Sequence, residues 1–198
     1  MHITQTLGVS AALLLLAACS PTPELAEQPE APAAEVEPAP APEPEPAPEP
    51  GPEGTRANPA PSGSTIEVSD NRGPIYEVTL GEPVLDATDV IMAENPYNEP
   101  PPEGMQYIML PVTYKYVGQE SGTPQYDVTI DFVSAAGTTH ATYDHSAVIP
   151  NDVMDINELY NGGTGEGNIA IVVPTADIEE GTWAMSTMIS EPYFIAVK

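Results

Sequence analysis

The sequence predicts an all-β protein whose residues 63–198 form an antiparallel β-sandwich. Apolar residues alternate with polar ones along two runs. In residues 105–116, every second residue from Ile108 to Tyr116 is apolar, and the same alternation occurs in residues 126–132. Alternate side chains of a strand point to the same face of a sheet, so each run predicts a strand with one apolar face and one wet face. No long window carries a helical stripe. Short strands joined by turns are typical of two packed antiparallel sheets.

The other predicted strands follow in chain order and are separated by clusters of Gly, Pro, Asn and Asp. Their ranges are 65–69, 75–80, 84–91, 138–143, 168–173, 182–188 and 193–197. Two helix-friendly stretches, at 154–159 and 176–180, are each about one turn long. Pro111 has no amide proton, and its place inside a strong strand predicts a bulge or an edge position.

Residues 1–18 have the features of a lipoprotein signal peptide that ends before Cys19, the only cysteine of the chain. The apolar stretch from Leu7 to Ala18 is shorter than the roughly 20 residues that span a bilayer, and it fits the apolar region of an export signal. Leu16-Ala17-Ala18-Cys19 resembles a lipobox, which implies acyl chains on the Cys19 thiol and anchoring on the outer face of the cell membrane. The alternative is an ordinary secretory signal, and the start of the chain carries no Lys or Arg.

Residues 19–62 are predicted to form a disordered, acidic stalk. They consist mainly of Pro, Ala and Glu, with nine glutamates against the single basic residue Arg56. Such a composition buries too little apolar surface to offset the entropy of ordering, and its alternating prolines favour an extended polyproline helix. The segment is interpreted as a spacer, and a proline-rich ligand for a partner is the alternative.

The charge of the chain excludes one class of partner. The chain has 30 acidic and 4 basic residues, a net charge of −26. Without the glutamates and Arg56 that precede residue 63, the predicted domain keeps 21 acidic and 3 basic residues, a net charge of −18. Phosphate recognition requires Lys and Arg, so nucleic-acid binding is not expected.

Several motifs of the domain carry a resemblance to a known group of proteins. They are Asn58–Ser64, Gly104–Thr113, the Asp127–Tyr143 hairpin, and Gly162–Ile169 running into Val172-Val173-Pro174. On these motifs, residues 55–198 resemble the telokin-like, immunoglobulin-like domain of unknown function of Gram-positive lipoproteins, a group similar to the mycobacterial immunoprotective extracellular antigen. The resemblance implies an anchored or secreted immunoglobulin-like sandwich and supplies no catalytic residues.

Motifs of catalysis and cofactor binding are not found in the sequence. The glycine run 162–167 is followed by a β-branched run and contains no Lys, so a hairpin turn is favoured over a phosphate-binding loop. The sequence contains neither Gly-x-Ser-x-Gly nor His-Glu-x-x-His, and the one cysteine is assigned to lipidation. We therefore expect a non-enzymatic protein without a cofactor.

Metal binding is the alternative that the residues leave open. Imidazole and carboxylate groups occur together at His140, Asp144 and His145, which suits a transition metal. Carboxylates in turn-like regions suit calcium, and these are Asp86, Asp89, Asp152 and Asp155. Surface histidines and solvated turn carboxylates are the simpler interpretation of the same residues.

The loop 92–104 is the candidate binding loop, with Tyr97 and Asn98 as its candidate contact residues. Long loops of a sandwich often carry binding, and tyrosine is a frequent anchor of contacts. A proline-stiffened crossover between the sheets is the other interpretation. Together these observations predict a lipid-anchored, non-enzymatic extracytoplasmic protein that binds an envelope protein or wall polymer. A calcium- or transition-metal-binding accessory lipoprotein is the alternative.

Overall fold

The computed structural model describes residues 51–176 and 178–198, so the predicted signal peptide, Cys19 and residues 20–50 lie outside the described residues. The strands are β1 Thr65–Asp70, β2 Gly73–Leu80, β3 Met105–Tyr116, β4 Ser121–Gly122, β5 Thr129–Val133, β6 Thr139–His140, β7 Leu159–Tyr160, β8 Thr164–Pro174, β9 Thr182–Ser186 and β10 Tyr193–Ala196. The short helices are α1 Thr88–Glu94, α2 Pro124–Asp127, η1 Val153–Asp155 and η2 Ile178–Glu180.

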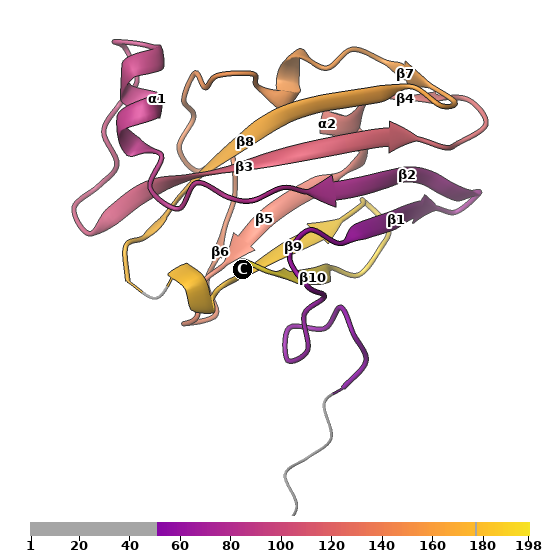
Figure 1. The fold of residues 1–198 in the computed structure, drawn as a ribbon, viewed down its shortest axis with the longest axis horizontal. Helices are drawn as coiled ribbons and strands as arrows, with labels where there is room; N and C mark the ends of the chain where they lie inside the picture. Colours follow the sequence, from indigo (N-terminus) through magenta and orange to yellow (C-terminus); the bar gives the residue numbers. More distant parts are fainter. Residues whose placement is uncertain (1–50, 177) are drawn as a thin grey trace, which may run out of the picture. The chain divides into compact units, whose positions relative to one another are not determined.

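Two antiparallel sheets make up the described residues, together with a small β4-β7 ribbon (Figure 1). The first sheet has the order β1-β2-β3-β8 and the second has the order β10-β9-β5-β6. Residues of both sheets belong to one buried cluster, so the sheets pack face to face. The predicted β-sandwich is confirmed. Within the described residues, no helix has the length and apolarity needed to cross a membrane.

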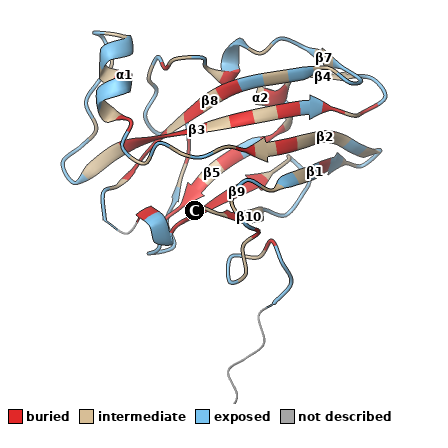
Figure 2. Cartoon of the chain, in the orientation of Figure 1, coloured by how far each residue is buried: buried red, intermediate tan, exposed pale blue. Residues whose placement is uncertain are grey.

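The main core lies between the sheets and follows the predicted alternation. In β3, the side chains from Ile108 to Tyr116 on one parity are buried, and Figure 2 shows buried residues along the strands of both sheets. The Phe132 and Trp183 rings pack edge to face with their centroids 5.5 Å apart. The hydroxyl of Tyr76 donates to Asp127 Oδ2 at 2.8 Å, so a buried polar group of this core is satisfied.

A second core covers the outer face of the first sheet and corrects the prediction of a wet face there. Tyr107 and Met109 lie on the opposite parity of β3, and both are buried. They form a cluster with Ile91 of α1, Ile149 and Val172. The first half of β3 is therefore buried on both faces, because α1 and the chain near residue 149 fold over it.

Three predicted strands were wrong in part, and of the range 138–143 only Thr139–His140, strand β6, is extended. The range 84–91 holds only an isolated bridge at Val84, after which the chain turns into α1. Asp86 Oδ1 accepts from Thr88 N at 3.2 Å just before the helix, and the fully buried Ile91 anchors it. In the range 126–132, the strand begins only at Thr129, because Pro124 starts the short helix α2.

Pro111 lies neither in a bulge nor on an edge strand, because β3 runs between β2 and β8 in regular register. The β2 pairing ends at Leu80 opposite Val112, one residue beyond Pro111. Gly81 N donates to the Pro111 carbonyl at 2.8 Å, so the backbone of Pro111 faces the irregular chain that follows β2. The missing amide proton therefore interrupts no ladder between named strands on that side.

The sandwich includes residues before the predicted boundary at residue 63. Ala60 is fully buried and bridges Ile195 in parallel, and its backbone N–H donates to the Phe194 carbonyl at 2.9 Å. Gly54 has φ 84°, and a Cβ there would lie 2.1 Å from the Tyr193 ring, so glycine is required at this close approach. Residues 54–60 thus belong to the sandwich and not to the predicted stalk.

Candidate functional site

A cleft of about 450 Å³ opens beside β5, where that strand has only a short neighbour. Strand β6 pairs with Phe132 and Val133 alone, so residues 129–131 have no strand on that side within the described residues. The chain from Thr142 to Met154 runs past this opening instead. The cleft is lined by apolar and aromatic residues (Tyr114, Val128, Ile130, Tyr143, Ala147, Ile149, Val153, Met154, Ile169, Ala170) and by polar ones (Gln125, Thr129, Asp131, Thr142, His145, Ser146, Asp152).

The carboxylates of Asp131 and Asp152 give the cleft its negative charge. Burial raises the pKa of the Asp131 carboxyl, and the nearby Asp144 carboxylate raises that pKa further. Burial also raises the pKa of the Asp152 carboxyl, although the Met154 N–H, which donates to its Oδ1 at 2.9 Å, acts in the opposite direction. Both side chains are partly buried, so their ionised forms are less well solvated than those of surface carboxylates.

No Lys or Arg among the described residues lines this cleft. The chain has four basic residues, and each contacts another part of the sandwich: Arg56 the carbonyls of Ser134 and Ala135, Arg72 the carboxylates of Asp70 and Glu120, Lys115 that of Glu77, and Lys198 that of Glu179. None of the ion pairs of the described residues includes Asp131 or Asp152. No Lys or Arg of the chain therefore neutralises the negative charge of the cleft.

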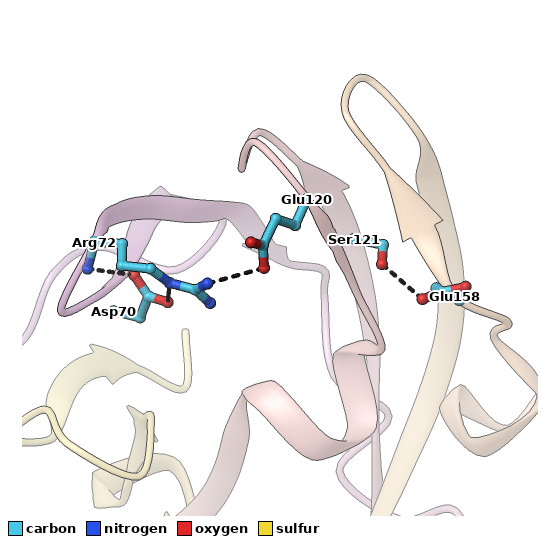
Figure 3. Close-up of polar contacts among 5 residues, drawn as sticks. All are labelled: Asp70, Arg72, Glu120, Ser121 and Glu158. Carbon is cyan, nitrogen blue, oxygen red and sulfur yellow. Dashed lines mark hydrogen bonds and ion pairs between the residues drawn. The ribbon is translucent and has the colours of Figure 1, made fainter.

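A second cleft, of about 510 Å³, lies beside β1 and β2 around Arg72. Arg72 bonds Asp70 at 3.2 Å and Glu120 at 2.8 Å, and Ser121 nearby donates to Glu158 at 2.6 Å (Figure 3). Arg72 is largely exposed and already pairs with both carboxylates, so its charge is not free to bind an anionic ligand, and ion pairs of this kind contribute little to stability. The cleft beside β5 is therefore the better candidate.

The candidate contact residues Tyr97 and Asn98 have different roles. Tyr97 is 89% exposed and remains available for contacts. Asn98 ties its loop to the chain near residue 148: its Nδ2 donates to the carbonyls of Ile91 at 2.7 Å and Val148 at 2.8 Å, and its Oδ1 accepts from Val148 N at 2.9 Å. The side chain of Asn98 is a structural clamp, which fits the crossover interpretation of this loop.

The structure separates most of the candidate metal ligands. His145 and Asp152 both line the cleft, whereas Asp144 accepts from Ala141 N at 2.9 Å in its own turn. His140 packs beside Phe132, and its Nε2 is buried without a hydrogen-bond partner. Within residues 51–176 and 178–198, no three His, Cys, Asp or Glu side chains are grouped to hold a metal ion.

Asp131 and Tyr143 are among the cleft residues that sequence reasoning did not select. Asp131 is one of the alternating polar residues of its strand, and the face of the sheet that carries such residues is normally solvated. Its position at an opening depends on the shortness of β6 and on the path of residues 142–154, and neither produces a local sequence signal. The unusual density of Thr, Tyr, Asp, His and Ser over residues 142–146 was the available hint.

We expect the Asp131→Asn variant to be more stable than the parent at neutral pH. A folded-state pKa above the unfolded value means that ionised Asp131 opposes folding, and this penalty grows as the pH rises through the raised pKa. Solvent screening keeps the gain below about 1 kcal/mol. Thermal unfolding of the parent and the variant at about pH 7 and about pH 3 checks this. The difference in stability should vanish at the lower pH, where the Asp131 carboxyl is protonated in both the folded and the unfolded state.

The matched control is Glu191→Gln, which removes the same charge from an exposed position outside the cleft. An equal gain in both variants would mean that relief of the overall negative charge, rather than the burial of Asp131, is responsible.

No protein-family model and no curated protein sequence matches the chain. Among solved structures, it is similar to MPT63, a secreted protein from Mycobacterium tuberculosis, with TM-score 0.50 and 17% identity over 71% of this chain and 98% of that chain. A conserved hypothetical protein from Bacillus anthracis gives TM-score 0.35 and 16% identity over 67% and 99% of the two chains. An uncharacterized β-sandwich protein from Clostridium difficile 630 gives TM-score 0.41 and 17% identity over 79% and 100%.

The similarity to MPT63 agrees with the resemblance that the strand and turn motifs of the sequence carry. At such low identity the likeness concerns the fold, so the site has to be argued from the residues of this chain. The chain is a β-sandwich protein with the fold of a secreted mycobacterial protein.

Proposed function

We propose that the chain is a non-enzymatic, lipid-anchored extracytoplasmic protein that holds another cell-envelope component in the cleft beside β5. The observation that carries the proposal is the cleft itself. Its volume lies within the range of ligand sites, roughly 300–1,000 Å³, and apolar walls with a few convergent polar groups are the usual composition of such sites.

The proposal of binding without catalysis is supported by the hydrogen bonds of the serines. A nucleophilic serine requires a base, most often histidine, within hydrogen-bond reach. The hydroxyls of Ser64, Ser121, Ser134 and Ser190 bond carbonyl, carboxylate or amide groups instead. These four serines are thus bonded to groups other than a catalytic base, which suits retention of a ligand rather than its conversion.

The proposal of a lipid anchor rests on the lipobox resemblance that ends at Cys19, and the secreted state of MPT63 supports an extracytoplasmic location. The Cys19→Ala variant is expected to lose the acyl mass from its N-terminus and to leave the membrane fraction, because no thiol remains to accept the lipid. Fractionation and mass spectrometry of the protein check this. The control is Ser20→Ala, which should stay in the membrane fraction, and retention of Cys19→Ala there would contradict lipid anchoring.

Binding at the cleft is tested by placing a photoreactive amino acid at Tyr143 and cross-linking in living cells. Tyr143 lines the cleft and is 79% exposed, so substitution there should leave the fold intact. We expect one dominant cross-linked species at this position. The controls are the exposed Tyr160, outside the cleft, and Tyr97, in the loop first suggested by the sequence.

Equal cross-linking at Tyr143 and Tyr160 would contradict a specific site at the cleft. Cross-linking confined to Tyr97 would instead move the binding surface to the loop 92–104.

A further inference from the structure

The cleft beside β5 combines negative charge with apolar walls, and this combination narrows the chemistry of its ligand. Asp131 and Asp152 enter it from two different parts of the chain, the strand β5 and the turn before η1. Both are partly buried, and neither takes part in an ion pair among the described residues. An anionic ligand would be repelled here, whereas a cation would supply the counter-charge that no Lys or Arg of the chain provides.

The walls favour an organic cation over a hydrated metal ion. Ile130, Ile149 and Met154 provide aliphatic surface, and the Tyr143 ring stands at the same cleft. Aliphatic side chains bury a hydrocarbon stem, and the face of an aromatic ring attracts an ammonium group. A calcium ion takes six or more oxygen ligands, and the described residues group no three carboxylate or imidazole side chains for a metal.

The Asp152 carboxylate is fixed in position by a hydrogen bond to the backbone. Its Oδ1 accepts from Met154 N at 2.9 Å, which fixes the side chain at the start of η1. A carboxylate has two oxygens that accept several hydrogen bonds, so this contact leaves capacity for an ammonium donor. A fixed acceptor loses less entropy on binding than a freely rotating one.

We propose that this cleft binds an organic ammonium group carried on a short apolar stem, an inference that rests on the proposed function of the cleft. The carboxylates of Asp131 and Asp152 accept from the ammonium, and the stem lies along the aliphatic wall. The ammonium belongs either to a small free amine or to an amine displayed by an envelope component.

The test compares three probes with the same six-carbon stem: hexylammonium, 1-hexanol and hexanoate. Each is titrated into the isotope-labelled full chain, and amide chemical shifts are recorded. We expect hexylammonium to shift the amides of residues 129–131 and 142–154, with 1-hexanol binding at least about fivefold more weakly and hexanoate not binding, because the cleft favours positive charge. Equal binding of hexylammonium and 1-hexanol would overturn the inference.

Two substitutions assign the charge contacts. Asp131→Asn and Asp152→Asn keep the shape of each side chain, and asparagine preserves the contact of residue 152 with the Met154 N–H. Each is expected to weaken hexylammonium binding about tenfold, the loss that corresponds to one charge-assisted hydrogen bond. The Glu191→Gln control should bind within about twofold of the parent. An equal loss in that control would overturn the site, since only the net charge would then matter.

The source of the ammonium is resolved by displacement of bound hexylammonium. If envelope fragments displace hexylammonium, and acetylation of their amines abolishes the displacement, the ligand is an amine displayed by the envelope. If only a low-molecular-weight cell extract displaces it, the ligand is a free amine. Failure of the ammonium preference does not decide the proposed function, because photo-cross-linking at Tyr143 does not depend on the charge of the ligand.

Discussion

Replacing Trp183 with alanine is expected to lower the free energy of unfolding of the sandwich by about 3–5 kcal/mol, the usual cost of truncating a buried aromatic side chain. Trp183 lies on β9, is 1% exposed, and packs its ring edge to face on Phe132 of β5 at 5.5 Å between centroids. Its removal takes away transfer free energy and leaves a cavity between the sheets. A loss of this size is a large fraction of the 5–15 kcal/mol that typically stabilises a domain.

Denaturant titration followed by circular dichroism measures this effect, because Trp183 is the only tryptophan and its fluorescence disappears with the substitution. Met188→Ala in the turn between β9 and β10 is the control. Met188 is 96% exposed, so its truncation should change stability by less than about 0.5 kcal/mol. A similar small change for Trp183→Ala would mean that β9 is not packed into the core.

Replacing Asn98 with alanine is expected to lower the free energy of unfolding by about 1–3 kcal/mol and to loosen one wall of the cleft. The amide of Asn98 makes the described hydrogen bonds to Ile91 and Val148, so alanine leaves a backbone N–H and two carbonyls without their partner. Ala147 and Ile149, on either side of Val148, both line the cleft. The change should therefore reach the candidate site although Asn98 itself does not line it.

Hydrogen exchange separates the two parts of the Asn98 clamp. In Asn98→Ala the Val148 amide loses its acceptor and should exchange faster. In Asn98→Asp that acceptor remains, so Val148 should stay protected while stability still falls through the lost donors. The adjacent Tyr97→Ala is the control, and it should change neither quantity because Tyr97 is exposed. Unchanged exchange in Asn98→Ala would show that the clamp does not hold this segment.

The strands were largely predictable because one buried face imposes a period of two on the sequence. Within β3 the alternation from Ile108 to Tyr116 corresponds to the main core. The same run concealed the second core, since the face that carries Tyr107 and Met109 is predicted to be wet as a whole. A strand that is apolar on both parities is typical of burial on both faces, and that pattern was visible in residues 107–110.

The helix α1 was missed because a short apolar run is ambiguous between strand and helix. Asp86 and Thr88 before the run and Asn95-Pro96 after it were the helix start and stop signals that decide such cases. The cleft was beyond sequence reasoning for a different reason. It is lined by residues that range from Tyr114 to Ala170, and their proximity depends on the path of the chain after β6.

The segment 54–60 has a consequence for how these molecules behave at high local concentration. The last strand of a sheet presents free backbone groups on which a strand of another molecule can add. Strand β10 is such a strand, yet three backbone hydrogen bonds link it to this segment, through Gly54 with Phe194 and through Ala60 with Phe194 and Ala196. An incoming strand must first displace a competitor that is covalently attached and therefore always present. The residues that join the sandwich to the preceding chain thus also protect it against edge-to-edge aggregation.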